Sequence, residues 1–254
     1  MNEDIAIRVR GLATRFGEQV VHENLDLDVR RGEILGVVGP SGSGKSVLLR
    51  EIVGLDQPSE GEVAFVPADD DREPRLGVMF QDGALFSNLT VLENVEAPLR
   101  EHTAISPELR AEIAAVKLAM AGLGADAHHK KPSQISGGMR KRAAVARALA
   151  LDPDLLFLDE PTAGLDPIAA ERFDRMVEEL AHALGLTVFL VTHDLDTLHA
   201  VCDRVAVLYG GKIAAIGPIE EIAAGAEGWV KDYFSGPRGR AASRERGESA
   251  PGGR

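Results

Sequence analysis

The chain reads Gly39-Pro40-Ser41-Gly42-Ser43-Gly44-Lys45-Ser46 directly after the dense apolar run Ile34–Val38. The apolar run predicts a buried strand, and residues 47–54 have the spacing of a helix. Glycines in such a loop let backbone N–H groups close around phosphate oxygens, while Lys45 adds a positive charge and the Ser46 hydroxyl can coordinate Mg²⁺. The order of strand, loop and helix therefore predicts that these eight residues bind nucleotide phosphates in an α/β fold.

The bulk composition limits what else the chain can be. Of its 254 residues, 44% are hydrophobic and 27% are charged, as in an ordinary globular protein. A net charge of −12 argues against a general nucleic-acid binder, so we expect no nucleic-acid partner. One cysteine, Cys202, excludes an internal disulfide and fits a reducing cytoplasm. No apolar run approaches the roughly 18 residues that span a bilayer, so work at a membrane would need another chain.

The apolar runs are of two kinds, which together predict two sheets. Three β-rich runs bounded by glycine-containing turns predict a small antiparallel sheet, at residues 5–9, 25–29 and 62–66. Denser runs predict strands buried on both faces, as in a mostly parallel sheet, at Ile34–Val38 and at residues 76–80, 155–158, 187–191 and 205–209. We therefore expect an α/β fold with a mostly parallel core sheet and a small antiparallel β subdomain.

The stretch between the second and third dense runs predicts helices instead of strands. Residues 107–121 and 138–151 both have helical spacing. We expect a helical subdomain at about residues 82–152, inserted into the sheet core, within one domain that spans residues 1–235. Residues 236–254 contain almost nothing apolar and are expected to be disordered.

A further helix is expected at residues 168–184. Asp166 can cap its first turn, and Pro167 suits the first helical position. The spacing places four apolar side chains on one face, namely Phe173, Val177, Leu180 and Leu184. This face is expected to pack against the core.

Polar side chains follow three of the dense apolar runs and are expected to meet at one edge of the sheet. Asp159 and Glu160 end the run at 155–158, while Gln81 and His193 follow two other runs. Ligands of open α/β sheets bind at the carboxyl ends of the strands. Asp159 is then placed to hold Mg²⁺, and Glu160 to polarise or deprotonate an attacking water. In this setting Gln81 suits the Mg²⁺ or water shell, and His193 suits a hydrogen bond to the γ-phosphate.

A second glycine-containing segment reads Ile135-Ser136-Gly137-Gly138-Met139 and precedes a predicted helix. Ser136 can cap that helix, and the two glycines let a phosphate approach its N-terminus, where free N–H groups and the helix dipole favour an anion. The simplest use for two phosphate half-sites is a head-to-tail homodimer. Each ATP would lie between the glycine-rich loop of one copy and this segment of the other.

Taken in order, these motifs resemble the nucleotide-binding domain of ABC transporters, which has a P-loop NTPase (RecA-like) core. The resemblance covers about residues 5–235. It identifies six elements: Walker A (39–46), Q-loop (Gln81), signature (Ser136, Gly137, Gly138), Walker B (155–160), D-loop (164–166) and switch histidine (His193). It implies that ATP binds with Mg²⁺, that Phe16 stacks on adenine, and that Ser46, Gln81 and Asp159 surround the metal ion. Glu160, His193 and Gln81 would then carry the hydrolysis.

A narrower resemblance concerns the segment Phe80-Gln81-Asp82-Gly83-Ala84-Leu85-Phe86 and Met139, which follows the signature glycines. Both are similar to the ATPase subunit of MCE-associated, Mla-type lipid transporters. That group implies an ATPase homodimer, an integral membrane permease, an MCE-domain lipid-binding protein and a phospholipid or related lipid as cargo. The ATPase would lie at the cytoplasmic face of the inner membrane. The alternatives are an ABC importer or exporter ATPase for another solute, a soluble ABC ATPase, and a non-hydrolytic nucleotide-binding regulator.

Two further segments allow more than one interpretation. The run Arg140-Lys141-Arg142 after the signature is either a solvated helix face or a group that helps to hold the nucleotide of a partner chain. Near the C-terminus, Trp229, Val230, Tyr233 and Phe234 form one apolar helical face. We expect that face to pack on its own domain and not to dock on a partner.

Overall fold

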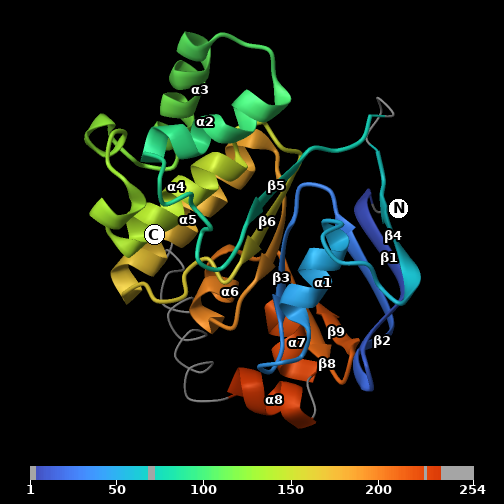
Figure 1. The fold of residues 1–254 in the computed structure, drawn as a ribbon. Coiled ribbons are helices and arrows are strands. Elements are labelled where there is room, and N and C mark those ends of the chain that lie inside the picture. Colours follow the sequence, from blue (N-terminus) through green and yellow to red (C-terminus); the bar gives the residue numbers. More distant parts are fainter. Residues whose placement is uncertain (1–3, 68–71, 226–227, 236–254) are drawn as a thin grey trace.

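The computed structural model describes residues 4–67, 72–225 and 228–235 (Figure 1). Two sheets form its framework, and helices cover them. The predicted fold class is therefore confirmed: a mostly parallel sheet, a small antiparallel sheet and an inserted group of helices. The tail at residues 236–254 lies outside the described residues, so its expected disorder stays a prediction.

The larger sheet has six strands in the order β5-β6-β7-β3-β8-β9. Its neighbouring strands are parallel, except for the antiparallel pair β8 and β9. The strands are β3 (Ile34–Val38), β5 (Leu76–Met79), β6 (Leu155–Asp159), β7 (Thr187–Val191), β8 (Arg204–Tyr209) and β9 (Lys212–Gly217). Five of them match predicted runs. Strand β9 was not predicted, because its side chains alternate between exposed and half-buried and include two alanines, so it lacks a dense apolar run.

The smaller sheet is antiparallel, with the order β2-β1-β4. It consists of β1 (Ile5–Phe16), β2 (Gln19–Arg30) and β4 (Glu60–Phe65). Strands β1 and β2 are longer than predicted, because the tip of their hairpin is exposed and has no buried apolar alternation. The turn at the tip uses Gly17 at a φ of 60°, which glycine adopts without steric cost.

Helices connect the strands, and their starts follow from local sequence. They are α1 (Lys45–Ile52), α2 (Val91–His102), α3 (Pro107–Met120), α4 (Gly137–Ala148), α5 (Pro167–Leu184), α6 (Leu195–Val201), α7 (Ile219–Gly225) and α8 (Gly228–Ser235). Helix α2 begins with a capping box between Thr90 and Glu93, and α3 begins after the cap Ser106. Helices α2, α3 and α4 lie between β5 and β6 in the chain and form the green and yellow-green group in Figure 1.

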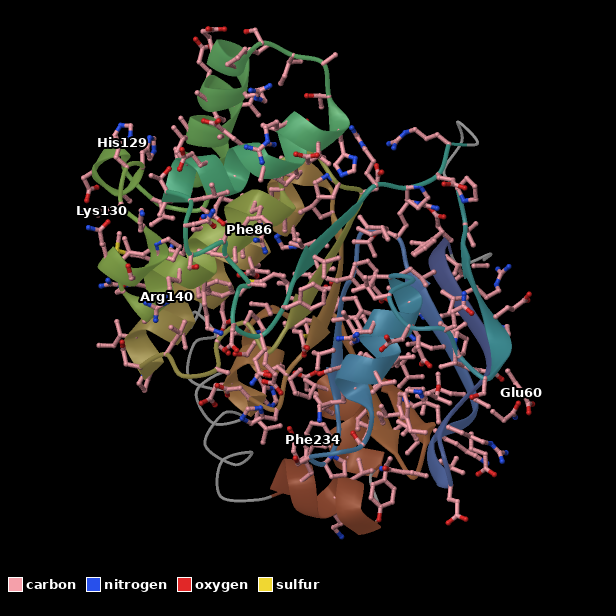
Figure 2. All side chains as sticks on the ribbon, viewed as in Figure 1. Glu60, Phe86, His129, Lys130, Arg140 and Phe234 are labelled. Atoms are coloured by element: carbon pink, nitrogen blue, oxygen red, sulfur yellow. The ribbon has the colours of Figure 1, made fainter. Side chains whose placement is uncertain are left out.

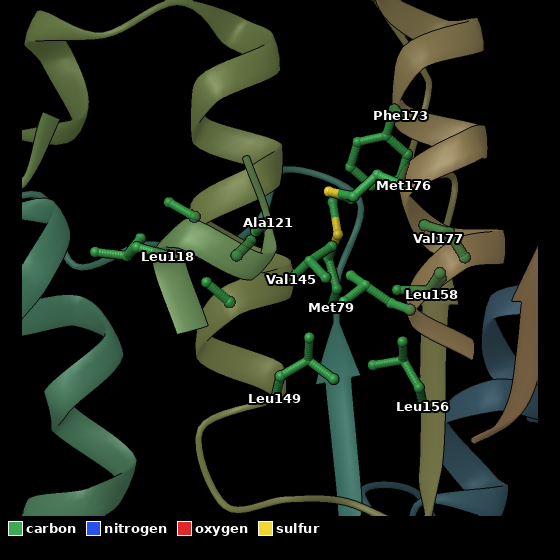
Figure 3. Packing of buried hydrophobic residues seen from close by; sticks show 14 of the residues in the cluster. Met79, Leu118, Ala121, Val145, Leu149, Leu156, Leu158, Phe173, Met176 and Val177 are labelled. Carbon is green, nitrogen blue, oxygen red and sulfur yellow. The ribbon is translucent and has the colours of Figure 1, made fainter. Parts of the chain in front are cut away.

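The largest core cluster joins this helical group to the sheet (Figure 3). Side chains of α4 and α5 pack there on β5 and β6, including Met79, Val145, Leu149, Leu158 and Phe173. Full burial of one such side chain contributes about 1.5–3 kcal/mol. The cluster therefore holds α4, which begins at the signature segment, against β5, which precedes Gln81, and β6, which ends at Asp159.

The start of α5 is as predicted, but one residue of its apolar face is not buried. The Asp166 side chain accepts a hydrogen bond from the backbone N–H of Ala169, and Phe173 is buried. Leu184, expected on the same face, is 42% exposed. It is the last residue of the helix, because Gly185 adopts a left-handed φ of 63° and ends it there. Leu184 therefore lies at the exposed C-terminal end of the helix.

The topology brings four loops to one edge of the larger sheet. Strands β5, β6, β7 and β3 are neighbours and run parallel, so the loops after their carboxyl ends lie together. These loops carry the glycine-rich segment, Gln81, Glu160 and His193. Among the described residues, no helix combines the length and apolarity that crossing a membrane requires.

Candidate active site

The glycine-rich loop lies between β3 and α1, as predicted. Gly44 precedes the helix at a φ of 96°, and no side chain caps the helix. The Lys45 ammonium donates to the backbone carbonyls of Gly39 (2.9 Å) and Pro40 (3.1 Å), so it spans the loop. Burial lowers the pKa of Lys45, while the nearby carboxylates of Glu160 and Asp159 oppose this change. The loop therefore offers uncapped helical N–H groups and one cation, which is the chemistry that a phosphate needs.

A cleft of about 900 Å³ opens beside this loop. That volume suits a nucleotide-sized ligand. Its lining joins the loop to other predicted site residues and comprises Gly39, Pro40, Ser41, Lys45, Glu160, His193, Asp194, Leu195, Asp196 and Tyr233. The structure thus brings the predicted phosphate loop, water-activating acid and histidine to one cavity.

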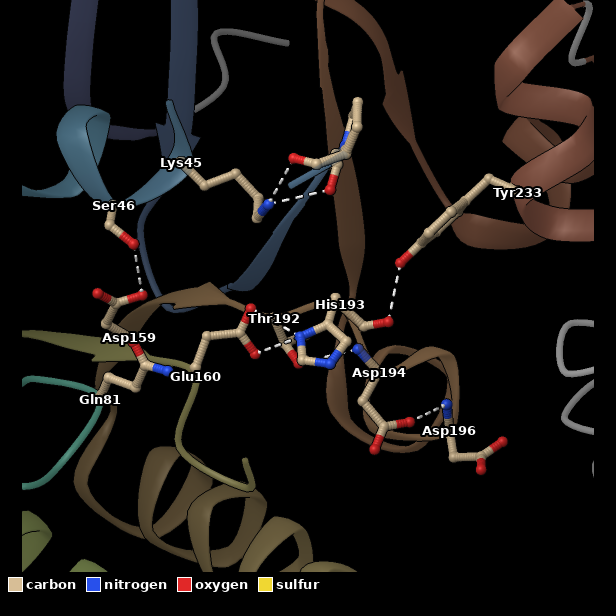
Figure 4. A network of polar contacts seen from close by, with 12 residues as sticks. Lys45, Ser46, Gln81, Asp159, Glu160, Thr192, His193, Asp194, Asp196 and Tyr233 are labelled. Carbon is tan, nitrogen blue, oxygen red and sulfur yellow. Dashed lines mark hydrogen bonds and ion pairs between the residues drawn. The ribbon is translucent and has the colours of Figure 1, made fainter. Parts of the chain in front are cut away.

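Ser46 and Asp159 meet at the foot of the loop (Figure 4). The Ser46 hydroxyl donates to Asp159 Oδ1 at 3.0 Å. Burial raises the pKa of Asp159, and the hydrogen bond from Ser46 partly offsets that rise. Gln81 follows β5, the neighbour of β6, and its exposed side chain is drawn beside Asp159 in Figure 4. A hydroxyl, a carboxylate and an amide oxygen form a hard-donor set of the type that Mg²⁺ prefers.

Glu160 and His193 form a close pair at the mouth of the cleft. His193 Nδ1 lies 2.8 Å from both carboxylate oxygens of Glu160. The Glu160 side chain is 14% exposed, whereas that of His193 is 64% exposed. Glu160 adopts a left-handed φ of 46°, a conformation that costs a residue other than glycine of the order of 1–3 kcal/mol. Its amide still bonds to the Val191 carbonyl (2.8 Å), so the strained residue is anchored while its carboxylate reaches the cleft.

Lys141 is the residue of this site that the sequence interpretation missed. Both readings of 140–142 leave its side chain in solvent or facing a partner, yet Lys141 is only 8% exposed. Its ammonium donates to the backbone carbonyls of Gln81 (2.9 Å) and Glu160 (3.2 Å). Burial lowers the pKa of Lys141, while the surrounding carboxylates, first Asp82, oppose this change. Helical spacing could have revealed this position, because Val145 lies four residues later and is fully buried.

The neighbours of Lys141 also bond within the chain. Arg140 donates to the Ile135 carbonyl at 3.0 Å, and Arg142 donates to the Ala121 carbonyl at 3.0 Å. The interpretation of this run as a solvated helix face is therefore wrong for Lys141. It is incomplete for Arg140 and Arg142, because backbone carbonyls at the ends of a loop and a helix accept hydrogen bonds from both arginines.

The signature segment has the predicted local form but lies away from the first cleft. Ser136 caps α4 by accepting a hydrogen bond from the backbone N–H of Met139 at 3.2 Å. A second hollow of about 510 Å³ includes Ser136 and Gly138 in its lining and shares no lining residue with the first. Phe16, predicted to stack on adenine, is 56% exposed at the end of β1 and does not line the first cleft. Within one chain, then, Ser136 and Gly138 line a hollow separate from the first cleft, and the stacking role of Phe16 stays a prediction.

Tyr233 of α8 lines the cleft and is the second residue of the site that the sequence interpretation missed. Its hydroxyl donates to the backbone carbonyl of His193 at 3.0 Å. Burial raises the pKa of Tyr233 to about 12, so the hydroxyl keeps its proton at neutral pH. Phe234 is buried, and Val230 and Tyr233 pack on the same cluster, which confirms for these three residues that the face packs on its own domain.

Comparison with known proteins agrees with a nucleotide-binding site in this chain. The family model described as ABC transporter matches residues 22–163. The intermembrane phospholipid transport system ATP-binding protein MlaF of Haemophilus influenzae is 40% identical over 232 residues, which cover 87% of each chain. The probable ribonucleotide transport ATP-binding protein mkl of Mycobacterium leprae is 36% identical, over 92% of this chain and 70% of its own.

Solved structures match as well. The dimeric structure of a bacterial ABC transporter cassette has a TM-score of 0.75 and 35% identity, and the match covers 84% of this chain and 98% of that one. A dimeric post-hydrolysis state of the cassette, bound to ADP and Pi, matches with the same values. A glycine-rich loop, an acid at a strand end and a histidine around one cleft thus occur here on a shared fold, and the chain belongs to the ABC transporter family as an ATP-binding protein that hydrolyses ATP.

Proposed function

We propose that this protein is the ATPase subunit of an ABC transporter that moves phospholipid or a related lipid between membranes. It would work as a homodimer at the cytoplasmic face of the inner membrane, with an integral membrane permease and an MCE-domain lipid-binding protein. The observation that carries the proposal is the 40% identity to MlaF across 87% of both chains. The mkl relative, named for ribonucleotide transport, is less similar and matches only 70% of its own length.

The segment that resembles lipid-transporter ATPases is held rigidly, which supports its use as a docking element. Asn94 is fully buried, accepts from the Phe86 backbone N–H (2.7 Å) and donates to the Phe86 carbonyl (3.1 Å). Phe86, labelled in Figure 2, is nevertheless 53% exposed. The Arg147 guanidinium carbon lies 5.9 Å from the centre of its ring. An exposed aromatic on an ordered backbone loses little conformational entropy when a partner covers it.

The proposed chemistry assigns one task to each site residue. Ser46 and Asp159, with Gln81 beside them, would hold Mg²⁺, which neutralises phosphate charge when bound. Glu160 would accept a proton from the attacking water, and its pairing with His193 keeps the carboxylate turned toward the cleft. His193 would exchange that pairing for the γ-phosphate once ATP binds. Lys141 would hold the loops of Gln81 and Glu160 at a fixed spacing.

The dimer would complete the site. The signature residues lie in a separate hollow of the same chain, at a helix N-terminus that favours an anion. A head-to-tail arrangement would place Ser136, Gly137 and Gly138 of one copy over the nucleotide held by the Walker A loop of the other.

Purification of the full chain from membranes, followed by mass spectrometry of bound proteins and lipids, tests the proposal. We expect a permease, an MCE-domain protein and phospholipid to be recovered. Phe86→Ala should reduce permease recovery several-fold, whereas Tyr209→Ala, which removes another exposed aromatic, should not. Recovery of a soluble solute-binding protein in place of the MCE-domain protein would favour an ATPase for another solute.

A further inference from the structure

A buried polar cluster lies directly against the glycine-rich loop, outside the cleft described above. It consists of Thr14 on β1, His22 on β2 and Glu51 on α1, each of them at most 3% exposed. Thr14 and His22 are cross-strand neighbours in the antiparallel sheet. None of the three residues lines the cleft. The roles assigned to the cleft residues above leave this cluster without a function.

The hydrogen bonds in this cluster fix which ring nitrogen of His22 is a donor. Nε2 lies 3.2 Å from the Gly44 carbonyl oxygen, and a carbonyl can only accept, so Nε2 carries a hydrogen. Nδ1 lies 2.9 Å from Thr14 Oγ1 and 3.2 Å from Glu51 Oε2. The Thr14 hydroxyl donates its one proton to Glu51 Oε1 at 2.6 Å. The ring and the carboxylate therefore share one proton on the Nδ1 side, while Nε2–H stays directed at the loop.

Gly44 is tightly packed against this ring. A Cβ atom at Gly44 would lie only 2.5 Å from His22 Nε2, so the position accepts no side chain while His22 is in place. The Gly44 carbonyl also accepts the first hydrogen bond of α1, from Leu48 N at 2.8 Å. His22 is thus a second donor to the carbonyl on which the helix begins.

The orientation of this carbonyl has a direct consequence for phosphate binding. In a planar trans peptide, the C=O of one residue and the N–H of the next point in opposite directions. The C=O of Gly44 points toward β2 and His22, so the N–H of Lys45 points away from β2. Lys45 lines the cleft. We propose that His22 is a positioning residue, which holds the Gly44 peptide so that the Lys45 N–H faces the bound phosphate.

The surroundings of the cluster favour this role over a purely structural one. Leu12, Leu25 and Leu48 belong to the apolar cluster that surrounds the antiparallel sheet and α1. Two aliphatic side chains in place of His22 and Glu51 would avoid the cost of burying a charged pair, a change that is often neutral or stabilising. Glu51 Oε2 meets the ring at Nδ1, 3.2 Å away, so the carboxylate holds the ring whose other nitrogen donates to Gly44. An aliphatic pair could not donate to the Gly44 carbonyl.

A matched pair of substitutions tests this role by equilibrium binding of ATP to the full chain. The amide nitrogen of His22→Gln reaches the place of Nε2 and keeps the donor to Gly44, whereas that of His22→Asn reaches only the place of Nδ1. His22→Asn is one methylene smaller than His22→Gln, so the Leu25→Val variant below controls for the loss of buried volume. We expect His22→Asn to weaken ATP binding about tenfold, as for the loss of about 1.4 kcal/mol, and His22→Gln to stay within about threefold of the parent chain. Equal weakening by both variants, or unchanged binding by His22→Asn, would overturn the proposal.

Two further measurements keep the test decisive if a variant folds poorly. Leu25→Val trims a buried residue of the same strand that does not touch Gly44, so it should lower the melting temperature without weakening ATP binding. In the parent chain, ¹⁵N-labelled histidine should show a slowly exchanging Nε2–H for His22. A ring without a proton on Nε2 would contradict the proposal. None of these readouts depends on the cargo or on membrane partners, so they are independent of the lipid-transport proposal.

Discussion

The ammonium of Lys141 donates a hydrogen bond to the backbone carbonyl of Glu160 at 3.2 Å, and a second one to the carbonyl of Gln81 at 2.9 Å. The lysine belongs to α4, the helix that begins at the signature segment. One side chain thus joins the signature helix to the loop before the helical group and to the loop that carries Glu160, the proposed general base. A movement of α4 would therefore reach both loops by direct contact.

Lys141→Met should disconnect these loops while it keeps most of the buried aliphatic stem. A hydrogen bond to a charged group contributes about 1.5–3 kcal/mol, so we expect kcat for ATP hydrolysis to fall at least tenfold. The KM for ATP should change less, because Lys141 does not line the cleft. Arg175→Met is the control, since it removes an exposed cation of α5. An unchanged kcat in Lys141→Met would show that the two loops keep their positions without the lysine.

Glu160→Gln should retain ATP binding and lose hydrolysis. The amide cannot accept the proton of the attacking water, and a general base contributes about 100-fold or more to the rate. We expect the variant to form a stable dimer with ATP, which size-exclusion chromatography with light scattering would detect. Glu179→Gln, which removes the negative charge of an exposed side chain on α5, serves as the control. Hydrolysis at the parent rate would refute the assignment of Glu160 as the base.

Gln81→Ala should weaken the coupling to the membrane partner more than ATP binding. The Gln81 side chain is exposed, and its backbone is held by Lys141 through the carbonyl, which the substitution leaves in place. We therefore expect ATP affinity within about threefold of the parent, since less than about 1 kcal/mol of binding is at stake. The measurement compares ATP binding by the isolated chain with ATPase activity in vesicles that contain the co-purified permease. Equal loss of binding and stimulation would contradict a coupling role.

The arrangement of the site could be predicted because buried parallel strands are easy to recognise in an amino-acid sequence. Strands covered on both faces appear as short continuous apolar runs, so each run also locates the polar residue that follows it. Asp159, Glu160, Gln81 and His193 were assigned to one sheet edge in this way, and the structure places them at that edge. The bounds of the domains and the roles of these residues stay predictions until variants are measured.

Other elements were missed for physical reasons. Helix α2 contains Pro98, which argues against a helix, although the capping pair Thr90 and Glu93 marks its start. Lys141 and His22 are polar residues whose partners lie far away in the chain, at Gln81 and Glu51. Local periodicity cannot show where a buried charge finds its acceptor, because tertiary packing decides it.

Asp174 gives a prediction about stability and pH. Burial raises its pKa from 3.8 to about 7 and outweighs the hydrogen bond from the Thr197 hydroxyl at 2.8 Å. The folded chain keeps this carboxyl protonated where the unfolded chain ionises it. Its contribution to stability is therefore complete below pH 4 and is lost as the pH rises through about 7. At one pKa unit per 1.4 kcal/mol, the loss amounts to at most about 4 kcal/mol.

Asp174→Asn should remove this pH dependence, because the amide resembles the neutral acid and can still accept from Thr197. We expect the variant to melt only slightly above the parent at pH 5, where the folded carboxyl is still protonated and the unfolded one has just passed its ordinary pKa of 3.8. Between pH 5 and pH 8.5 this difference should grow by at least about 5 °C, since 1 kcal/mol corresponds to about 2–4 °C in a chain of this size. Asp126→Asn replaces an exposed carboxylate, so its melting temperature should not rise relative to the parent as the pH increases. A difference of the same size at both pH values would mean that Asp174 is already ionised in the folded chain at pH 5, held by its neighbours against the cost of burial.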